Sequence, residues 1–373
     1  MLKKIVCFIA AVVFATLLVA PAKSKASKQS ITSAQAAVML EYSTNTVLYS
    51  KNAHEKLPMA STTKVMTAIV AIENGNLDDM VTTVDEAYGV EGSSIYLCKN
   101  EKISLRDLLY GLMLRSGNDA AVAIAYHIGG DINGFVGMMN NKAKQIGAAN
   151  TNFTNPNGLP DNNHYTTAYD LGIICSYALK NETFKNIVSS QYYVAESGDV
   201  KRTMMNKNKL LWQYDGAIGI KTGYTTAAGK CLTFAADKNN MTVVGVVLNC
   251  VNMFSDSIEL MDWCYENYEM YNVVKKGTIV MRSQINHSNT LAAFITDTDI
   301  FVPVKKSEGI KLTTNINIKE NIAAPLSAGF NVGVLELHCE DRLIASCNLL
   351  CAENVKPISI RYYFEKIALK MVS

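Results

Sequence analysis

The chain has 373 residues, of which 49% are hydrophobic and 18% charged, a balance that supports a large buried core and excludes a disordered or low-complexity protein. Its 35 Lys and Arg residues nearly match its 33 Asp and Glu residues, which gives a formal charge of +2. Neither sign gathers into a long block, so no nucleic-acid partner is expected. A chain of this length should fold into two or more compact units.

The first 26 residues have the organisation of a secretory signal peptide. A basic start at 1–4 is followed by an apolar run at 5–20 and by small residues suited to cleavage after Ala22 or Ala26. The alternative is an uncleaved membrane anchor, but a run of 16 residues is shorter than the ~20 that span a bilayer. We therefore expect a signal peptide at 1–26 and a mature protein that acts outside the cytoplasm.

Short β-rich runs at 36–42 and 46–49 predict a hairpin, and from Ser61 apolar residues recur at helical spacing as far as Asn74. Further helices are predicted at 104–114, 118–129, 132–147, 167–180 and 255–268, strands at 231–236 and 241–248, and a loop at 150–158. This order predicts an α+β fold, with helices packed on an antiparallel sheet, over residues 30–272.

Two smaller segments follow. Residues 275–356 contain short alternating runs that predict a small all-β domain. Residues 357–373 predict an amphipathic helix whose apolar face contains Ile360, Phe364, Ile367 and Met371. That face fits either contact with a membrane surface or docking on the β domain, because hydrophobic period alone does not separate the two.

Cysteine and histidine give no sign of a metal site. Eight cysteines follow the signal region without the spacing of paired C-x-x-C ligands, and the five histidines are scattered without an H-E-x-x-H motif. We expect most of the cysteines to be buried free thiols, and we expect no metal and no organic cofactor.

The pattern Ser61-Thr-Thr-Lys64 places a hydroxyl and an amine on one face of a helix. A neutral lysine there can take the proton of a serine nucleophile, without a histidine. The pattern alone is weak, because it arises about once by chance in a chain of this length. A serine that caps a helix beside a solvated lysine would also produce it.

Two further patterns strengthen the catalytic interpretation. Ser116-Gly-Asn118 lies where two predicted helices meet, and Lys221-Thr-Gly223 precedes two predicted strands. Gly223 would let a substrate backbone lie along a strand edge. Lys221 would attract an anionic group of the substrate and would help to keep Lys64 neutral by repulsion. The three patterns in this order predict one catalytic constellation.

With the residues around these motifs, the chain resembles the serine-type D-Ala-D-Ala carboxypeptidases, which are low-molecular-weight penicillin-binding proteins. The likeness extends over about residues 34–272 and lies in the blocks 57–67, 107–121, 155–159 and 220–229. It implies a transpeptidase-like or β-lactamase-like catalytic domain. The β domain and the terminal helix are similar to those of the family in layout only.

The resemblance implies that Ser61 is the acylated nucleophile, Lys64 its base and Ser116 the proton shuttle to the leaving D-alanine. It also implies substrate-binding roles for five residues, with the backbone N–H groups of Ser61 and Tyr224 as the oxyanion hole: Asn118, Lys221, Thr222, Gly223 and Tyr224. The implied partners are the D-Ala-D-Ala end of peptidoglycan stem peptides and β-lactam antibiotics, which would acylate Ser61.

Two positions depart from the family pattern. Lys207 and Met253 stand where some or many members carry Arg, and neither lysine nor a thioether binds a carboxylate in a bidentate manner. Strict preference for a terminal carboxylate is therefore less secure than acylation of Ser61.

Two alternatives remain open at this point. One is a class A-like β-lactamase, whose deacylating Glu lies in an E-x-x-L-N loop. Glu182–Asn186 has this spacing, but Lys185 replaces Leu, and the segment is more typical of a helix start. The other is a catalytically silent penicillin- or peptidoglycan-binding protein.

Overall fold

A computed structural model describes residues 31–339, 341–359 and 364. The chain divides into two compact units between Tyr268 and Glu269. The predicted signal peptide at 1–26 and almost all of the predicted terminal helix at 357–373 lie outside the described residues. Within the described residues, no helix is both long enough and apolar enough to cross a membrane.

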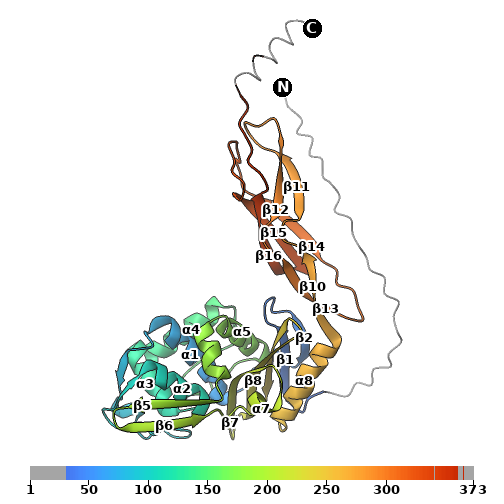
Figure 1. Cartoon of the computed structure of the whole chain (residues 1–373). Helices are drawn as coiled ribbons and strands as arrows, with labels where there is room; N and C mark the ends of the chain where they lie inside the picture. Colours follow the sequence, from blue (N-terminus) through green and yellow to red (C-terminus); the bar gives the residue numbers. More distant parts are fainter. Residues whose placement is uncertain (1–30, 340, 360–363, 365–373) are drawn as a thin grey trace. The chain divides into compact units, whose positions relative to one another are not determined.

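The first unit is built on a five-stranded sheet with the order β2-β1-β9-β8-β7 (Figure 1). All four ladders of this sheet are antiparallel, as the sequence predicts. Its strands are β1 (Ala36–Glu41), β2 (Val47–Lys51), β7 (Ala217–Thr225), β8 (Gly229–Lys238) and β9 (Met241–Leu248). The first and last thirds of this unit thus build a single sheet, and the segment between them supplies most of the helices.

Helices cover the sheet, which lies between α8 and a group of helices that includes α1, α4 and α5 (Figure 1). The helices are α1 (Lys64–Asn74), α2 (Leu105–Tyr110), α3 (Asn118–Gly129), α4 (Ile132–Gln145), α5 (Ala168–Leu179), α6 (Glu182–Ser189), α7 (Leu210–Gln213) and α8 (Met253–Asn267). The first eight residues of α1, from Lys64 to Ala71, are all buried. This continuous burial makes α1 the central helix of the unit.

Short polar side chains begin several of these helices. The side chain of Ser104 accepts a hydrogen bond from the backbone N–H of Asp107 at the start of α2, and that of Thr167 accepts one from Asp170 at the start of α5. Such caps satisfy backbone N–H groups that have no partner within the helix. Helix 104–114, predicted as one element, is α2 followed by a π-helical turn, η3 (Gly111–Arg115).

Several small elements were not predicted from the sequence. They are the hairpin of β5 (Tyr192–Ser197) and β6 (Val200–Met205), the pair β3 (Met80–Thr82) and β4 (Lys102–Ser104), and the 3₁₀ turns η1 (Ala60–Thr63) and η2 (Asp85–Ala87). The hairpin and η1 both contribute to the candidate site.

The second unit is all β over residues 269–359 in its described part, as predicted. Its main sheet has the order β11-β12-β16-β15-β14, and β10 pairs with β13. The strands are β10 (Tyr268–Val274), β11 (Ile279–Gln284), β12 (Leu291–Thr296), β13 (Ile300–Lys305), β14 (Thr313–Ile318), β15 (Asn331–Cys339) and β16 (Arg342–Cys351). Phe294, Val302, Val332 and Leu349 are fully buried in its core. This core is separate from that of the first unit.

All eight cysteines of the described chain are free thiols, and six of them are buried: Cys175, Cys231, Cys250, Cys264, Cys347 and Cys351. The expectation of buried free thiols is confirmed for these six.

Candidate active site

Ser61 lies in the 3₁₀ turn η1, directly before α1. The residues at the N-cap positions of η1 and α1 are Met59 and Thr63, and neither makes a side-chain capping bond. Ser61 is therefore not a helix cap. The alternative interpretation of the S-x-x-K pattern, a capping serine beside a solvated lysine, is wrong. Ala60, just before it, has a left-handed backbone with φ 49°, which is uncommon for a residue with a Cβ.

Lys64 is fully buried, and its Nζ contacts three polar atoms. Nζ lies 3.0 Å from Ser61 Oγ, 2.7 Å from Asn118 Oδ1 and 2.5 Å from the carbonyl oxygen of Asn157. A neutral amine has two N–H groups and one lone pair. The two oxygens that only accept hydrogen bonds use both N–H groups, which leaves the lone pair for the hydroxyl of Ser61.

The electrostatics of the site favour this neutral form. Burial lowers the pKa of Lys64 well below its usual value, and the positive charges of Lys221 and Lys207 lower it further, whereas Asp119 opposes them. Burial and the charge of Lys207 lower the pKa of Lys221 to about 7. Both effects follow from the cost of holding an ammonium ion away from water and beside other cations.

Strand β7 brings the Lys221-Thr222-Gly223 motif against the Ser61 turn. A Cβ on Gly223 would lie 3.1 Å from the backbone nitrogen of Ser61, so strand and turn are in direct contact. Lys221 is buried, and its Nζ donates to the carbonyl of Thr222 at 2.8 Å. Tyr224, which follows the motif, is 66% exposed, so its side chain is not packed within the site.

Ser116 and Asn118 lie where η3 meets α3. Ser116 adopts a left-handed backbone with φ 66° and is buried, and within the described residues its hydroxyl has no hydrogen-bond partner. Three hydrogen bonds hold Asn118 in place. Its Nδ2 donates to the carbonyl of Glu91 at 2.5 Å, and its backbone N–H donates to the carbonyl of Ser93 at 2.7 Å. Its Oδ1 accepts from Lys64 Nζ. The structure thus links Ser61, Lys64 and Asn118 in one chain of contacts.

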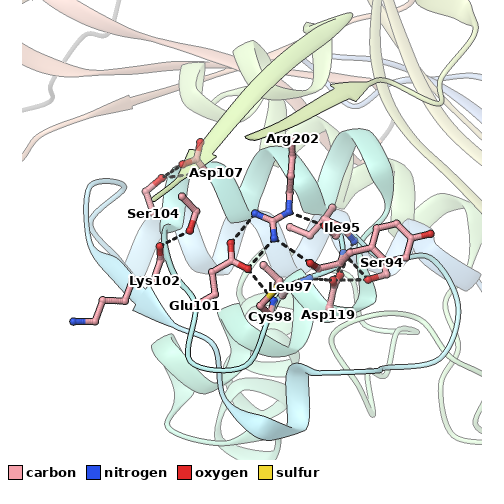
Figure 2. A network of polar contacts seen from close by, with 12 residues as sticks. Ser94, Ile95, Leu97, Cys98, Glu101, Lys102, Ser104, Asp107, Asp119 and Arg202 are labelled. Atoms are coloured by element: carbon pink, nitrogen blue, oxygen red, sulfur yellow. Dashed lines mark hydrogen bonds and ion pairs between the residues drawn. The ribbon is translucent and has the colours of Figure 1, made fainter. Parts of the chain in front are cut away.

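A polar network fixes the loop that holds Asn118 (Figure 2). The carboxylate of Asp119 accepts hydrogen bonds from the backbone N–H of Ile95 at 3.1 Å. Arg202, from β6, donates to both oxygens of Glu101 at 2.6 and 2.8 Å and to the carbonyl of Ile95 at 2.8 Å. The Arg202 and Glu101 side chains are only 10% and 6% exposed. A bidentate pair of this kind fixes direction as well as distance.

The segment 155–159 covers the Ser61 turn from the other side. Asn155 Oδ1 accepts a hydrogen bond from the backbone N–H of Gly158 at 2.7 Å. Gly158 has φ +87°, and a Cβ there would lie 2.0 Å from the carbonyl oxygen of Ala60. Only glycine fits both the backbone angle and the space. This close approach brings the Asn157 carbonyl to Lys64.

His164 is the residue of the site that the sequence did not reveal. Its Nδ1 accepts a hydrogen bond from the backbone N–H of Thr154 at 3.0 Å, so the proton is on Nε2, which donates to Thr63 Oγ1 at 2.7 Å. That hydroxyl donates in turn to the carbonyl of Ala60 at 2.8 Å. Burial lowers the pKa of His164 to about 4, with Asp161 opposing the change. A neutral histidine therefore holds the turn before Ser61. In the sequence, the nearest segment that resembles the family is the block at 155–159.

The remaining sequence-derived positions belong to other segments of the first unit. Lys207 Nζ donates to Ser93 Oγ at 3.1 Å, and Met253 is the first residue of α8. Glu182 is the first residue of α6, after the capping side chain of Asn181. The segment is therefore a helix start, as predicted, and not an E-x-x-L-N loop.

Comparisons with known proteins agree with this geometry. Residues 22–252 match the family described as D-alanyl-D-alanine carboxypeptidase, and residues 268–357 match the family described as penicillin-binding protein 5, C-terminal domain. The chain is 34% identical over 334 residues to D-alanyl-D-alanine carboxypeptidase DacF of Bacillus subtilis (strain 168), covering 87% of this chain and 86% of that protein.

Two further relatives cover one unit and both units respectively. The D-alanyl-D-alanine carboxypeptidase of Streptomyces sp. (strain K15) is 37% identical over 241 residues, which are 59% of this chain and 83% of that protein. The crystal structure of penicillin binding protein 5 from Haemophilus influenzae matches with a TM-score of 0.72 and 29% identity, over 89% of this chain and 100% of that chain. The chain therefore belongs to the D-alanyl-D-alanine carboxypeptidase family, the low-molecular-weight penicillin-binding proteins, and is a serine-type hydrolase of peptidoglycan.

Proposed function

We propose that this carboxypeptidase works through an acyl-enzyme on Ser61, with Lys64 as the general base. The observation that carries the proposal is the environment of Lys64 Nζ: two acceptors at 2.7 and 2.5 Å occupy its N–H groups, and Ser61 Oγ lies 3.0 Å away on the remaining side. The lowered pKa of Lys64 favours the neutral form that a general base requires.

In the first half of the reaction, the proton of Ser61 passes to Lys64 as Oγ forms a bond to the carbonyl carbon of the penultimate D-alanine. The backbone N–H groups of Ser61 and Tyr224 are proposed to stabilise the oxyanion. The C–N bond then breaks, and Ser116, whose hydroxyl is otherwise unpartnered within the described residues, is proposed to pass the proton to the leaving D-alanine. Water attacks the ester in the second half and restores Ser61.

The substrate is proposed to lie between β7 and the Ser116–Asn118 turn. Asn118 would bind the substrate amide, and Lys221 and Thr222 would face its carboxylate. The absence of a side chain at Gly223, which approaches the Ser61 backbone closely, lets the substrate backbone lie along β7. Penicillins have a strained amide with a neighbouring carboxylate and would enter the same groove.

Intact-mass spectrometry tests the nucleophile and the substrate together. The wild-type protein is incubated with penicillin, and separately with a stem pentapeptide. We expect a penicillin adduct and release of one D-alanine, and both should vanish in Ser61→Ala. Ser189→Ala, which removes an exposed serine of α6, is the matched control and should behave as wild type. Penicillin labelling of Ser61→Ala would contradict the assignment, and labelling without peptide cleavage would favour a silent penicillin-binding protein.

We further propose that the protein is exported by cleavage of a signal peptide at 1–26, that the catalytic domain spans 30–272 and the β domain 275–356, and that residues 357–373 form an amphipathic helix on the membrane surface. Family members act on peptidoglycan outside the cytoplasm, which supports export.

Residues 358–373 contain three basic residues and one acidic residue beside an apolar face, which suits an anionic surface. Flotation with anionic vesicles should retain the full chain and lose a chain truncated after Pro357; equal retention would favour docking on the β domain.

A further inference from the structure

A basic pocket of about 430 Å³ lies beside the candidate active site. It is formed by the end of η3, the end of β6 and the segment that continues into α7. Its lining residues are Arg115, Met205, Asn206, Lys207, Lys209, Trp212 and Gln213. None of the predicted catalytic or substrate-binding residues lines it.

The lining of the pocket contains three cations and no carboxylate. Within the described residues, Arg115, Lys207 and Lys209 form no ion pair. Arg115 and Lys207 repel each other: partial burial and the charge of Arg115 both lower the pKa of Lys207. Like charges held together without a counter-charge create a positive potential that an anion relieves.

The pocket adjoins the catalytic residues through Lys207. The charge of Lys207 lowers the pKa of both Lys64 and Lys221, and its backbone N–H donates to the carbonyl of Leu114, two residues before Ser116, at 3.2 Å. A ligand that enters the pocket can therefore be part of a molecule already bound at Ser61. Trp212, 40% exposed, offers an apolar surface next to the charges.

We propose that this pocket binds a carboxylate of the stem peptide, with Arg115 as the principal ligand. The proposal rests on the proposed function, because it names a second contact for the same substrate. Arg115 can bind a carboxylate in a bidentate manner, which Lys207 and Met253 cannot. Because Lys221 and Thr222 are proposed to face the terminal carboxylate, and neither lines this pocket, the group that the pocket would bind is a free side-chain carboxylate further along the peptide.

Steady-state kinetics on three peptides test the proposal and separate the side-chain carboxylate from the terminal one. The first is a pentapeptide with a free carboxylate on the side chain of its third residue, the second is the same peptide with that carboxylate amidated, and the third is a short diacylated peptide that ends in D-Ala-D-Ala. The enzymes are wild type, Arg115→Gln, Lys209→Gln and, as matched control, Lys144→Gln, which removes an exposed charge on α4.

We expect Arg115→Gln to lower kcat/KM by roughly tenfold or more, mainly through KM, because hydrogen bonds between charged groups have this magnitude. Lys209→Gln should have a smaller effect in the same direction. A loss confined to the first peptide supports the proposal, and an equal loss on all three overturns it, because the variants would then act on a feature that all three peptides share.

The proposal is overturned if Arg115→Gln and Lys209→Gln match Lys144→Gln on every peptide while wild type releases D-alanine. Failure of the proposed function is distinct, because wild type would then release none. Unfolding monitored by tryptophan fluorescence shows whether the variants are folded, since both tryptophans, Trp212 and Trp263, lie in the first unit.

Discussion

Replacing His164 by Gln should make the stability of the first unit less dependent on pH. In the folded protein the His164 ring is neutral, and both of its nitrogens make hydrogen bonds, to Thr154 and Thr63. A proton on Nδ1 would turn an acceptor into a donor that faces the backbone N–H of Thr154. Protonation must therefore break this contact, and it also places a charge in a buried site.

The size of the effect follows from the pKa. The folded protein holds the pKa of His164 at about 4 instead of 6.5, and each pKa unit is worth about 1.4 kcal/mol. Because the folded pKa is lowered, the unfolded chain takes up the proton first, so the stabilisation is complete above pH 6.5 and is lost as the pH falls towards 4. Linkage gives a loss of roughly 2.5 kcal/mol between pH 7 and pH 4.5.

Urea unfolding followed by tryptophan fluorescence measures this loss in the first unit. Gln can still make one of the hydrogen bonds but does not titrate, so His164→Gln should be less stable than wild type at pH 7, and the difference should shrink by roughly 2.5 kcal/mol at pH 4.5. The exposed His54 provides the control, His54→Gln. If the difference between wild type and His164→Gln stays constant with pH, His164 is not the buried neutral group described here.

Three further changes test the lysines and β7. Lys64→Arg should abolish penicillin acylation as completely as Lys64→Ala, because a guanidinium does not release its proton near neutral pH; an adduct by mass spectrometry would require another base. Lys207→Gln removes a charge that lowers the pKa of Lys64 and Lys221, so both limbs of the pH profile of kcat/KM should move to higher pH, and an unmoved profile would exclude this coupling. Gly223→Ala places a Cβ 3.1 Å from the Ser61 nitrogen and should slow acylation roughly tenfold or more; stopped-flow labelling with a fluorescent penicillin at the wild-type rate would contradict that.

The contacts that the sequence predicts well are local ones. Ser61 and Lys64 are three residues apart, and one turn of helical backbone brings their side chains to 3.0 Å without help from the rest of the fold. The contact between Asn118 and Lys64 could be predicted only as part of a three-motif pattern, because 54 residues separate the two. The family resemblance, not periodicity, supplied that link.

The contacts that the sequence does not predict are set by tertiary packing. The Asn157 carbonyl is 93 residues from Lys64, and His164 is 101 residues from Thr63, and neither residue belongs to a repeating pattern. The hairpin of β5 and β6 escaped for another reason. Burial does alternate along both strands, but apolar residues such as Tyr192, Val194 and Met205 stand at exposed positions, so the sequence lacks the alternation of apolar and polar residues that predicts a strand.

The arrangement of charges suggests how substrate binding favours the proton transfer from Ser61 to Lys64. Lys64 and Lys221 are both buried, and within the described residues neither has a carboxylate partner, so the two can coexist only if one of them gives up its proton. A substrate carboxylate beside Lys221 would cancel part of the field that lowers the pKa of Lys64. We therefore expect the affinity of Lys64 for a proton to rise when the substrate binds, which is the moment at which Lys64 must accept the proton of Ser61. In the free enzyme the lowered pKa thus favours a deprotonated Lys64, and a bound substrate would make it a stronger base.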